Sequence, residues 1–273
     1  MLNRRTLTLA ALLVLLCTAR ALTHDYWLEP QAFFVRAGVG RAVVRMHVGM
    51  NLKSEAERPL QKDRTVKFQL FSGAETQDLL ASAQDNRTPV ADVRLARSGT
   101  YLFALERKAA TIKLDAPKFK EYLLEEGLES IIAERERARE SASEGRERYT
   151  RYLKTLVQAG SRRDDTYRRE VGQRLEIIPQ ENPYNLQRAQ SLGVRVMFEG
   201  RPLAGVRVFA QSRNAGKDGI LTATTDADGR ASFKLQNAGI WAIRLIHMRR
   251  CAGADCADID WESFWSSYTF GMR

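Results

Sequence analysis

The sequence has only three histidines, and they are its best candidates for chemistry at a metal ion. His24 follows an apolar leader, His47 lies in VVRMHVGM, and His247 lies near the end of IWAIRLIHM. Imidazole nitrogens without thiolate ligands suit Cu(II), Ni(II), Co(II) or Zn(II). If these three segments converge in the fold, His24, His47 and His247 form one divalent transition-metal site.

The leader is the reason why the position of His24 is of interest. Arg4 and Arg5 precede the apolar run LTLAALLVLL, and the leader ends in the small-residue pattern Ala19-Arg20-Ala21. This pattern indicates a secretory signal peptide over residues 1–21, and its apolar run is shorter than the roughly 20 residues of a membrane span. We therefore expect a periplasmic or otherwise secreted protein with no membrane span in the mature chain.

Two cleavage points would give His24 two different ways to bind a metal. Cleavage after Ala21 leaves Leu22-Thr23-His24 at the new terminus. There the amine, two deprotonated backbone amides and the imidazole can hold Cu(II) or Ni(II) in a square plane. Cleavage after Thr23 makes His24 the first residue, so its amine and ring chelate one ion and a further histidine completes a copper-type histidine brace. The simpler alternative is a terminal histidine with no role.

The other two histidines each have a structural alternative. Val44, Met46 and Val48 alternate onto one face of a predicted strand and leave His47 on the more polar face, free to bind a ligand, hydrogen-bond or stay solvated. His247 lies on an apolar strand face, which favours a buried imidazole paired with a backbone carbonyl as strongly as a ligand at the rim of a sandwich. Four carboxylates nearby in sequence could hydrogen-bond such histidines: Asp25, Glu29, Asp260 and Glu262.

Cys251 and Cys256 are the cysteines expected to remain once the leader, with Cys17, is removed. They flank Gly253 in CAGADC, and two cysteines this close in an exported protein favour a small disulfide loop. A thiolate metal site would need tighter C-x-x-C spacing and a second pair. The sequence therefore predicts a Cys251–Cys256 disulfide.

The composition is that of an ordinary globular chain with a basic surface. The formal net charge is +10, and it stays positive when the three leader arginines are removed. For an exported protein this charge favours a solvated basic face or an anionic envelope surface as neighbour, and we expect no nucleic-acid partner. No G-x-S-x-G elbow, H-E-x-x-H or phosphate-binding glycine loop occurs, so we do not expect an enzyme. An oxidase of the histidine-brace type is the one catalytic alternative.

Apolar patterning predicts a mainly β fold with two β-sandwich-like units, of immunoglobulin or prealbumin type, and a helical insertion. Short alternating runs punctuated by glycine predict an N-terminal β-rich unit over residues 22–116 and a C-terminal β-sandwich over residues 174–273. Helical spacing of leucine and isoleucine predicts the insertion over residues 117–165, with GRERYTRYLKTLVQAG as a second helix that ends at Gly160. We expect the aromatic residues of DIDWESFWSSYTF to pack into the C-terminal sandwich.

A series of motifs follows along the mature chain: HDYWLEP, VRMHVGMN, the helical KFKEYLLEEGLESIIAERERARE, LEIIPQENPYNL, GRPLAGVRVFA, TDADGRASFKL and GIWAIRLIHM. In this order they resemble a bacterial periplasmic family of unknown function whose members are described as nickel or cobalt uptake components. Residues 193–248 separately resemble the prealbumin-like or carboxypeptidase-regulatory sandwich. Family members commonly have an alanine-type cleavage signal directly before the histidine, whereas Leu22 and Thr23 intervene here.

The resemblance implies an exported β-sandwich protein that handles divalent transition metals. The leading hypothesis is a carrier or accessory for nickel, cobalt or copper uptake, with components of a metal-uptake transporter as expected partners. The alternative is a non-catalytic interaction or scaffold module of the cell envelope, which the likeness to carboxypeptidase-regulatory domains favours. The first hypothesis predicts one tightly bound divalent ion per chain, whereas the second predicts little or no metal.

Overall fold

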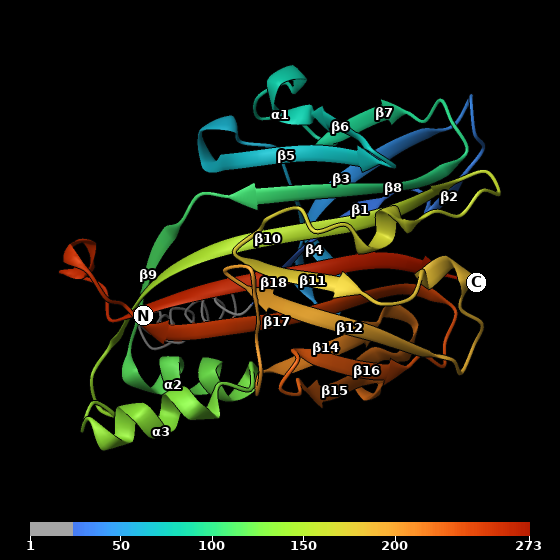
Figure 1. The fold of residues 1–273 in the computed structure, drawn as a ribbon. Coiled ribbons are helices and arrows are strands. Elements are labelled where there is room, and N and C mark those ends of the chain that lie inside the picture. Colours follow the sequence, from blue (N-terminus) through green and yellow to red (C-terminus); the bar gives the residue numbers. More distant parts are fainter. Residues whose placement is uncertain (1–23) are drawn as a thin grey trace, which may run out of the picture.

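The molecule is mainly β, as the sequence predicts (Figure 1). The computed structural model describes residues 24–273, apart from the side chains of residues 216–218, so the expected signal peptide of residues 1–21 lies outside the described residues. Within the described range, three sheets are accompanied by three α-helices: α1 Leu79–Ser82, α2 Ala116–Glu125 and α3 Glu129–Arg137.

The largest sheet has ten strands and extends through the whole molecule. Eight strands follow the order β15-β14-β17-β18-β10-β8-β5-β6, and β2 and β9 each pair with β10. Their bounds are β2 Phe34–Val35, β5 Thr65–Ser72, β6 Glu75–Asp78, β8 Gly99–Arg107, β9 Ala110–Leu114, β10 Gly145–Ala159, β14 Arg207–Ser212, β15 Ile220–Thr224, β17 Gly239–Arg250 and β18 Trp261–Met272. Strand β10, from the predicted helical insertion, pairs with β8 of the predicted N-terminal unit and with β18 of the predicted C-terminal unit, so one sheet contains strands of all three segments. The domain boundaries stay a prediction.

Two four-stranded sheets cover opposite faces of the large sheet. The first contains β1 Asp25–Pro30, β3 Arg41–Met50, β4 Lys53–Arg58 and β7 Ala91–Arg94. The second contains β11 Leu175–Pro179, β12 Ser191–Phe198, β13 Arg201–Pro202 and β16 Arg230–Lys234. Side chains of β8 alternate between the two cores, with Leu102 and Ala104 toward the second sheet and Phe103 and Leu105 toward the first. Sandwich packing therefore buries both faces of one central sheet.

The predicted second helix over residues 145–160 is wrong, because this segment is strand β10. From Tyr152 to Ala159 every residue is buried, and alternate side chains enter opposite cores, Tyr152 on one side and Leu153 on the other. A strand buried on both faces has no polar face, so its apolar residues also fit a helical spacing. The tyrosine, threonine and valine content of the segment favours the strand.

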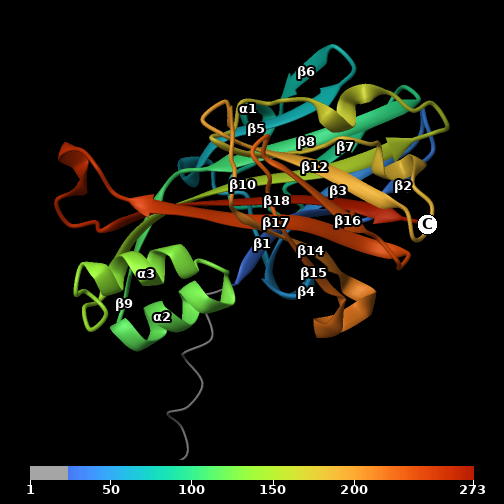
Figure 2. The ribbon, with the colours of Figure 1, turned by 60° about the horizontal axis from the view of Figure 1, so that its bottom comes forward.

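The helical prediction is confirmed for residues 116–137, where α2 and α3 form. Oδ1 of Asp115 accepts a hydrogen bond of 3.0 Å from the backbone N–H of Lys118, and Pro117 lies in the first turn, so α2 has a well-capped start. The helices pack on Trp261 and Trp265 of β18, so these two aromatic residues are buried against the helices and not in the predicted sandwich, whereas Phe264 and Tyr268 enter the sandwich core. Figure 2 shows α2 and α3 beside β9. In the described part of the chain no helix is long and apolar enough to cross a membrane.

Candidate metal centre and the cavity at His24

His24 lies immediately before β1, and its side chain, 14% exposed, forms part of a cavity wall. The cavity has a volume of about 320 Å³ and is enclosed by residues of β1, β3, β4, β9, β10 and β18, with Tyr122 of α2. Its polar lining includes Glu55, Glu147 and Arg151. The imidazole predicted as a metal ligand therefore lies in a partly enclosed polar site.

Glu55 is the carboxylate that faces His24. Its Oε2 atom lies 3.1 Å from Nε2 of His24, but the two groups are not aligned as a hydrogen bond, and Nε2 is buried without a hydrogen-bond partner. The Glu55 side chain is 51% exposed, so a small rotation can align it. A carboxylate at one ring nitrogen commonly fixes the tautomer of a histidine whose other nitrogen binds a metal.

The turn after β3 brings Glu55 to His24. Asn51 and Leu52 have φ angles of 52° and 58°, and β4 then returns antiparallel to β3. Glu55 is the extra residue of a bulge, because Gly49 pairs with Ser54 and the next pair joins Val48 to Ala56. Sequence reasoning missed Glu55, since this turn lacks the glycine that usually marks a tight hairpin. The sequence signal for this turn is Asn51, because asparagine tolerates a positive φ angle.

His47 lies on the opposite face of the β1–β3 pair from His24. It pairs with Trp27, and their ring centroids are 5.5 Å apart, whereas His24 shares its face with Tyr26 and the cavity. His47 Nδ1 is 2.8 Å from the hydroxyl of Ser54. Burial lowers the pKa of His47 below its usual value. The predicted alternation that puts His47 on the more polar face of its strand is confirmed.

His247 packs between aromatic rings on the far side of the large sheet. Its ring centroid is 4.5 Å from that of Phe198 and 6.2 Å from that of Phe264. Burial, with a smaller effect of the nearby Arg249 charge, lowers the pKa of His247 to about 4. This environment favours a neutral imidazole, and the predicted apolar strand face is confirmed by the buried Leu245 two residues earlier.

The structure does not bring the three histidines together. His24 and His47 point to opposite faces of β1 and β3, and His247 contacts Phe264, on the face of β18 opposite to the cavity residue Trp265. Among residues 24–273, no group of three His, Cys, Asp or Glu side chains is arranged to hold a metal ion. The same residues offer no second histidine at the cavity, so they do not supply the partner that a histidine brace needs.

The four carboxylates predicted to support the histidines instead pair with arginines. Oδ2 of Asp25 lies 3.2 Å from Nε of Arg244, and Oδ1 of Asp260 lies 2.6 Å from Nη2 of Arg146. Glu29 pairs with Arg213, and Glu262 pairs with Arg148 and Arg249. These carboxylates tie neighbouring strands and loops together, and Glu55 is the carboxylate that faces the candidate ligand.

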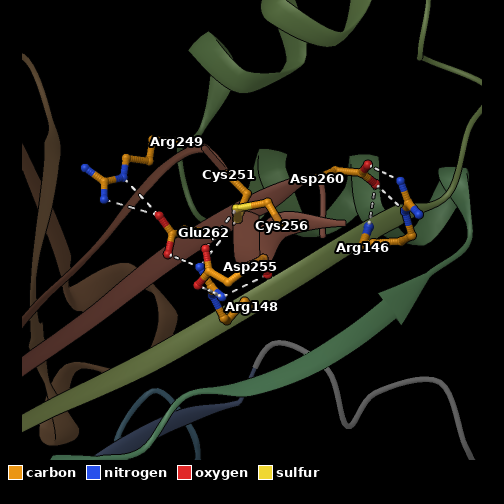
Figure 3. The surroundings of a disulfide bond; sticks show 8 residues. All are labelled: Arg146, Arg148, Arg249, Cys251, Asp255, Cys256, Asp260 and Glu262. Atoms are coloured by element: carbon orange, nitrogen blue, oxygen red, sulfur yellow. Dashed lines mark hydrogen bonds and ion pairs between the residues drawn. A yellow bond between two sulfur atoms is a disulfide. The ribbon is translucent and has the colours of Figure 1, made fainter. Parts of the chain in front are cut away.

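The predicted disulfide between Cys251 and Cys256 is confirmed, with the two Cα atoms 5.7 Å apart. It closes a small loop between β17 and β18 (Figure 3). Nη1 of Arg148 on β10 lies 2.6 Å from Oδ2 of Asp255 within this loop, and its Nη2 lies 2.7 Å from Oε1 of Glu262. The disulfide loop is therefore also anchored to the neighbouring strand by ion pairs.

Residues 21–249 match the family described as "Domain of unknown function (DUF4198)", so the chain belongs to that family. Comparison with curated proteins gave no match. Similar solved structures include the D0-D1 domain of intimin, at 12% identity and a TM-score of 0.21 over 91% of this chain and 98% of that one. Another is dimeric latent PorU from Porphyromonas gingivalis, at 10% identity and a TM-score of 0.21 over 91% of this chain and 20% of that one. These scores are too low to indicate a shared overall fold.

Proposed function

We propose that the mature chain is a periplasmic binding protein for one divalent transition-metal ion, with His24 and the new amino terminus as ligands. The family resemblance of the sequence supports a role as carrier or accessory in nickel or cobalt uptake, and the chelation chemistry of the terminus adds copper as a candidate. The observation that carries the proposal is the buried Nε2 atom of His24, which has no hydrogen-bond partner and faces the Glu55 carboxylate at 3.1 Å.

The described residues fit a site that is completed from the terminus. One imidazole and one carboxylate do not hold a metal ion tightly by themselves. Cleavage after Ala21 would add the amine of Leu22, which lies outside the described residues, and the backbone amides of Thr23 and His24. Together with the imidazole they would make a four-nitrogen plane suited to Cu(II) or Ni(II). In this geometry Nδ1 of His24 binds the metal, because it is the ring nitrogen nearer the main chain, and Glu55 holds Nε2.

The test compares two proteins that differ only at the terminus. The first begins at Leu22, and the second carries one extra alanine before Leu22, which moves the amine out of register with His24. Both are titrated with Cu(II) and Ni(II), and the visible absorption and electron paramagnetic resonance of the copper complex are recorded. We expect the Leu22 protein to bind one equivalent with the spectrum of four nitrogen ligands, and the extended protein to lose this spectrum.

Three substitutions locate the site within the fold. His24→Ala should abolish the four-nitrogen spectrum, whereas His47→Ala, on the opposite face of the same strand pair, should leave it unchanged. Glu55→Gln should weaken binding by about tenfold, because it removes the charge that orients the imidazole. Equal binding by the Leu22 and extended proteins, or loss of binding in His47→Ala alone, would contradict the proposal.

A further inference from the structure

The side chain of Arg151, on β10, lines the cavity and has no hydrogen bond or ion pair with any group of the described residues, and its Nε atom is buried without a partner. A guanidinium group carries five N–H donors in a fixed fork. Leaving such a group partly buried and unpaired is costly unless something else satisfies it. The guanidinium of Arg151 is therefore available to a ligand that accepts its hydrogen bonds.

Three aromatic rings hold the guanidinium in place. Its Cζ atom lies 4.2 Å from the ring centroid of Tyr26, 4.4 Å from that of Tyr149 and 5.2 Å from that of Trp265. These contacts come from β1, β10 and β18, and they stabilise the positive charge without using its N–H groups. Arg151 is therefore fixed in position and still able to donate hydrogen bonds.

The two buried carboxyl groups near Arg151 are bonded elsewhere. Asp25 pairs with Arg244, and Oε1 of Glu147 accepts hydrogen bonds from the hydroxyl groups of Tyr122, at 3.2 Å, and Ser263. Burial raises the pKa of both carboxyl groups, and the positive charge of Arg151 only partly opposes this effect. Neither carboxyl group accepts a hydrogen bond from the guanidinium of Arg151.

The rest of the cavity suits an organic anion better than an inorganic one. Its lining combines the aromatic rings with Val48, Ile112 and Leu114, and its volume of about 320 Å³ is at the small end of ligand sites. A phosphate would bring a second negative charge close to Glu147 and would leave these apolar walls without contact. A carboxylate matches the planar fork of an arginine with two parallel hydrogen bonds.

We propose that this cavity binds a small organic monocarboxylate, with the carboxylate on Arg151 and the apolar body of the ligand against Val48, Ile112 and Leu114. This inference does not depend on metal binding at His24, because its anchor is Arg151. It adds a small-molecule ligand to a chain whose family has no assigned function.

Benzoate is the probe for the test, with benzamide as its uncharged analogue and inorganic phosphate as the inorganic anion. The full mature protein is dialysed free of metal and chelator into a buffer without carboxylates, and binding is followed by calorimetry and by the fluorescence of Trp265 and its neighbours. We expect benzoate to bind at least about tenfold more tightly than benzamide or phosphate. Benzamide loses the charge-assisted hydrogen bonds to Arg151, and phosphate loses the contact with the apolar walls.

Three variants assign the binding to the cavity. Arg151→Gln should weaken benzoate binding by about tenfold or more. Ala56→Trp leaves Arg151 intact but fills part of the cavity, so it should also reduce binding, and it keeps the test valid if Arg151→Gln unfolds. Arg169→Gln is the matched control, because Arg169 also lies over an aromatic ring, Phe71, but outside the cavity.

Benzoate binding that is equal in the wild type, Arg151→Gln and Ala56→Trp would overturn the inference, and so would the absence of binding to folded wild-type protein. Tighter binding of phosphate than of benzoate would also overturn it. These outcomes leave the metal proposal unaffected, since the titrations are made without metal. Loss of copper binding with retained benzoate binding would contradict the metal proposal and leave the carboxylate site unaffected.

Discussion

Nζ of Lys154 lies 2.5 Å from Oε1 of Glu176, and both side chains are buried, at 1% and 4% exposure. Lys154 belongs to β10 and Glu176 to β11, so the pair joins the central sheet to the second four-stranded sheet. Glu176 also accepts hydrogen bonds from the backbone N–H groups of Val171 and Gly172. Burial lowers the pKa of Lys154, and the charge of Glu176 opposes this effect.

Lys154→Met should destabilise the protein by about 3–5 kcal/mol, because it leaves the carboxylate of Glu176 buried without its cation. The double variant Lys154→Met, Glu176→Gln should recover part of this loss. A neutral amide costs less to bury, and its oxygen can still accept from the two backbone N–H groups. Urea unfolding at pH 7 measures both effects. A loss of unfolding free energy below about 1 kcal/mol in the single variant would contradict this, because so small a value is typical of an exposed ion pair.

His247 should make stability fall as the pH falls. Its pKa is about 4 in the folded protein and 6.5 in the unfolded chain, where the imidazole is not buried. The unfolded chain therefore binds more protons between these two pH values. The contribution is therefore fully present above pH 6.5 and is lost as the pH falls toward 4, by at most about 3 kcal/mol.

The variant His247→Asn isolates this effect, since it does not titrate. The difference in unfolding free energy between the wild type and the variant should shift against the wild type from pH 7 to pH 4.5. Glu126, whose pKa burial raises to about 7, has the opposite pH dependence, but it is present in both proteins and cancels in the difference. A difference that does not change with pH would mean that the partly buried site of His247 does not lower its pKa.

The disulfide should contribute modestly to stability because its loop is short. In the chain-entropy model, closing a loop of this size is worth roughly 2 kcal/mol. Cys251→Ser with Cys256→Ser should lower the midpoint of urea unfolding accordingly and leave the fold unchanged, as circular dichroism can check. A much larger loss would show that the loop supports the β17–β18 pair rather than only its connection.

Much of the fold follows from local pattern, and the main error has a physical cause. Alternation on β3 and β17 identified the faces that carry His47 and His247, and the cysteine spacing identified the disulfide. The helical insertion predicted from residue 117 begins next to the observed start of α2 at Ala116. The segment from Gly145 to Ala159 was not, because a strand with both faces buried has no polar positions that distinguish it from a helix.

The candidate site was less accessible to sequence reasoning than the fold. His24 was found because it follows the leader, but its partner Glu55 depends on a hairpin turn and a bulge that the sequence marks only weakly. Arg151 was missed altogether, since it belonged to the segment that was taken for a helix. Contacts between β1, β10 and β18 create its surroundings, and these strands are far apart in the chain.

The most direct test of the central claim is native mass spectrometry of the protein exported to a bacterial periplasm, followed by the denatured mass of the same sample. We predict a mature chain that begins at Leu22 and carries one copper or nickel ion, which denaturation releases. A chain that begins elsewhere, or one that stays free of metal after titration with copper, nickel, cobalt and zinc, would contradict this prediction and would favour an envelope interaction module instead.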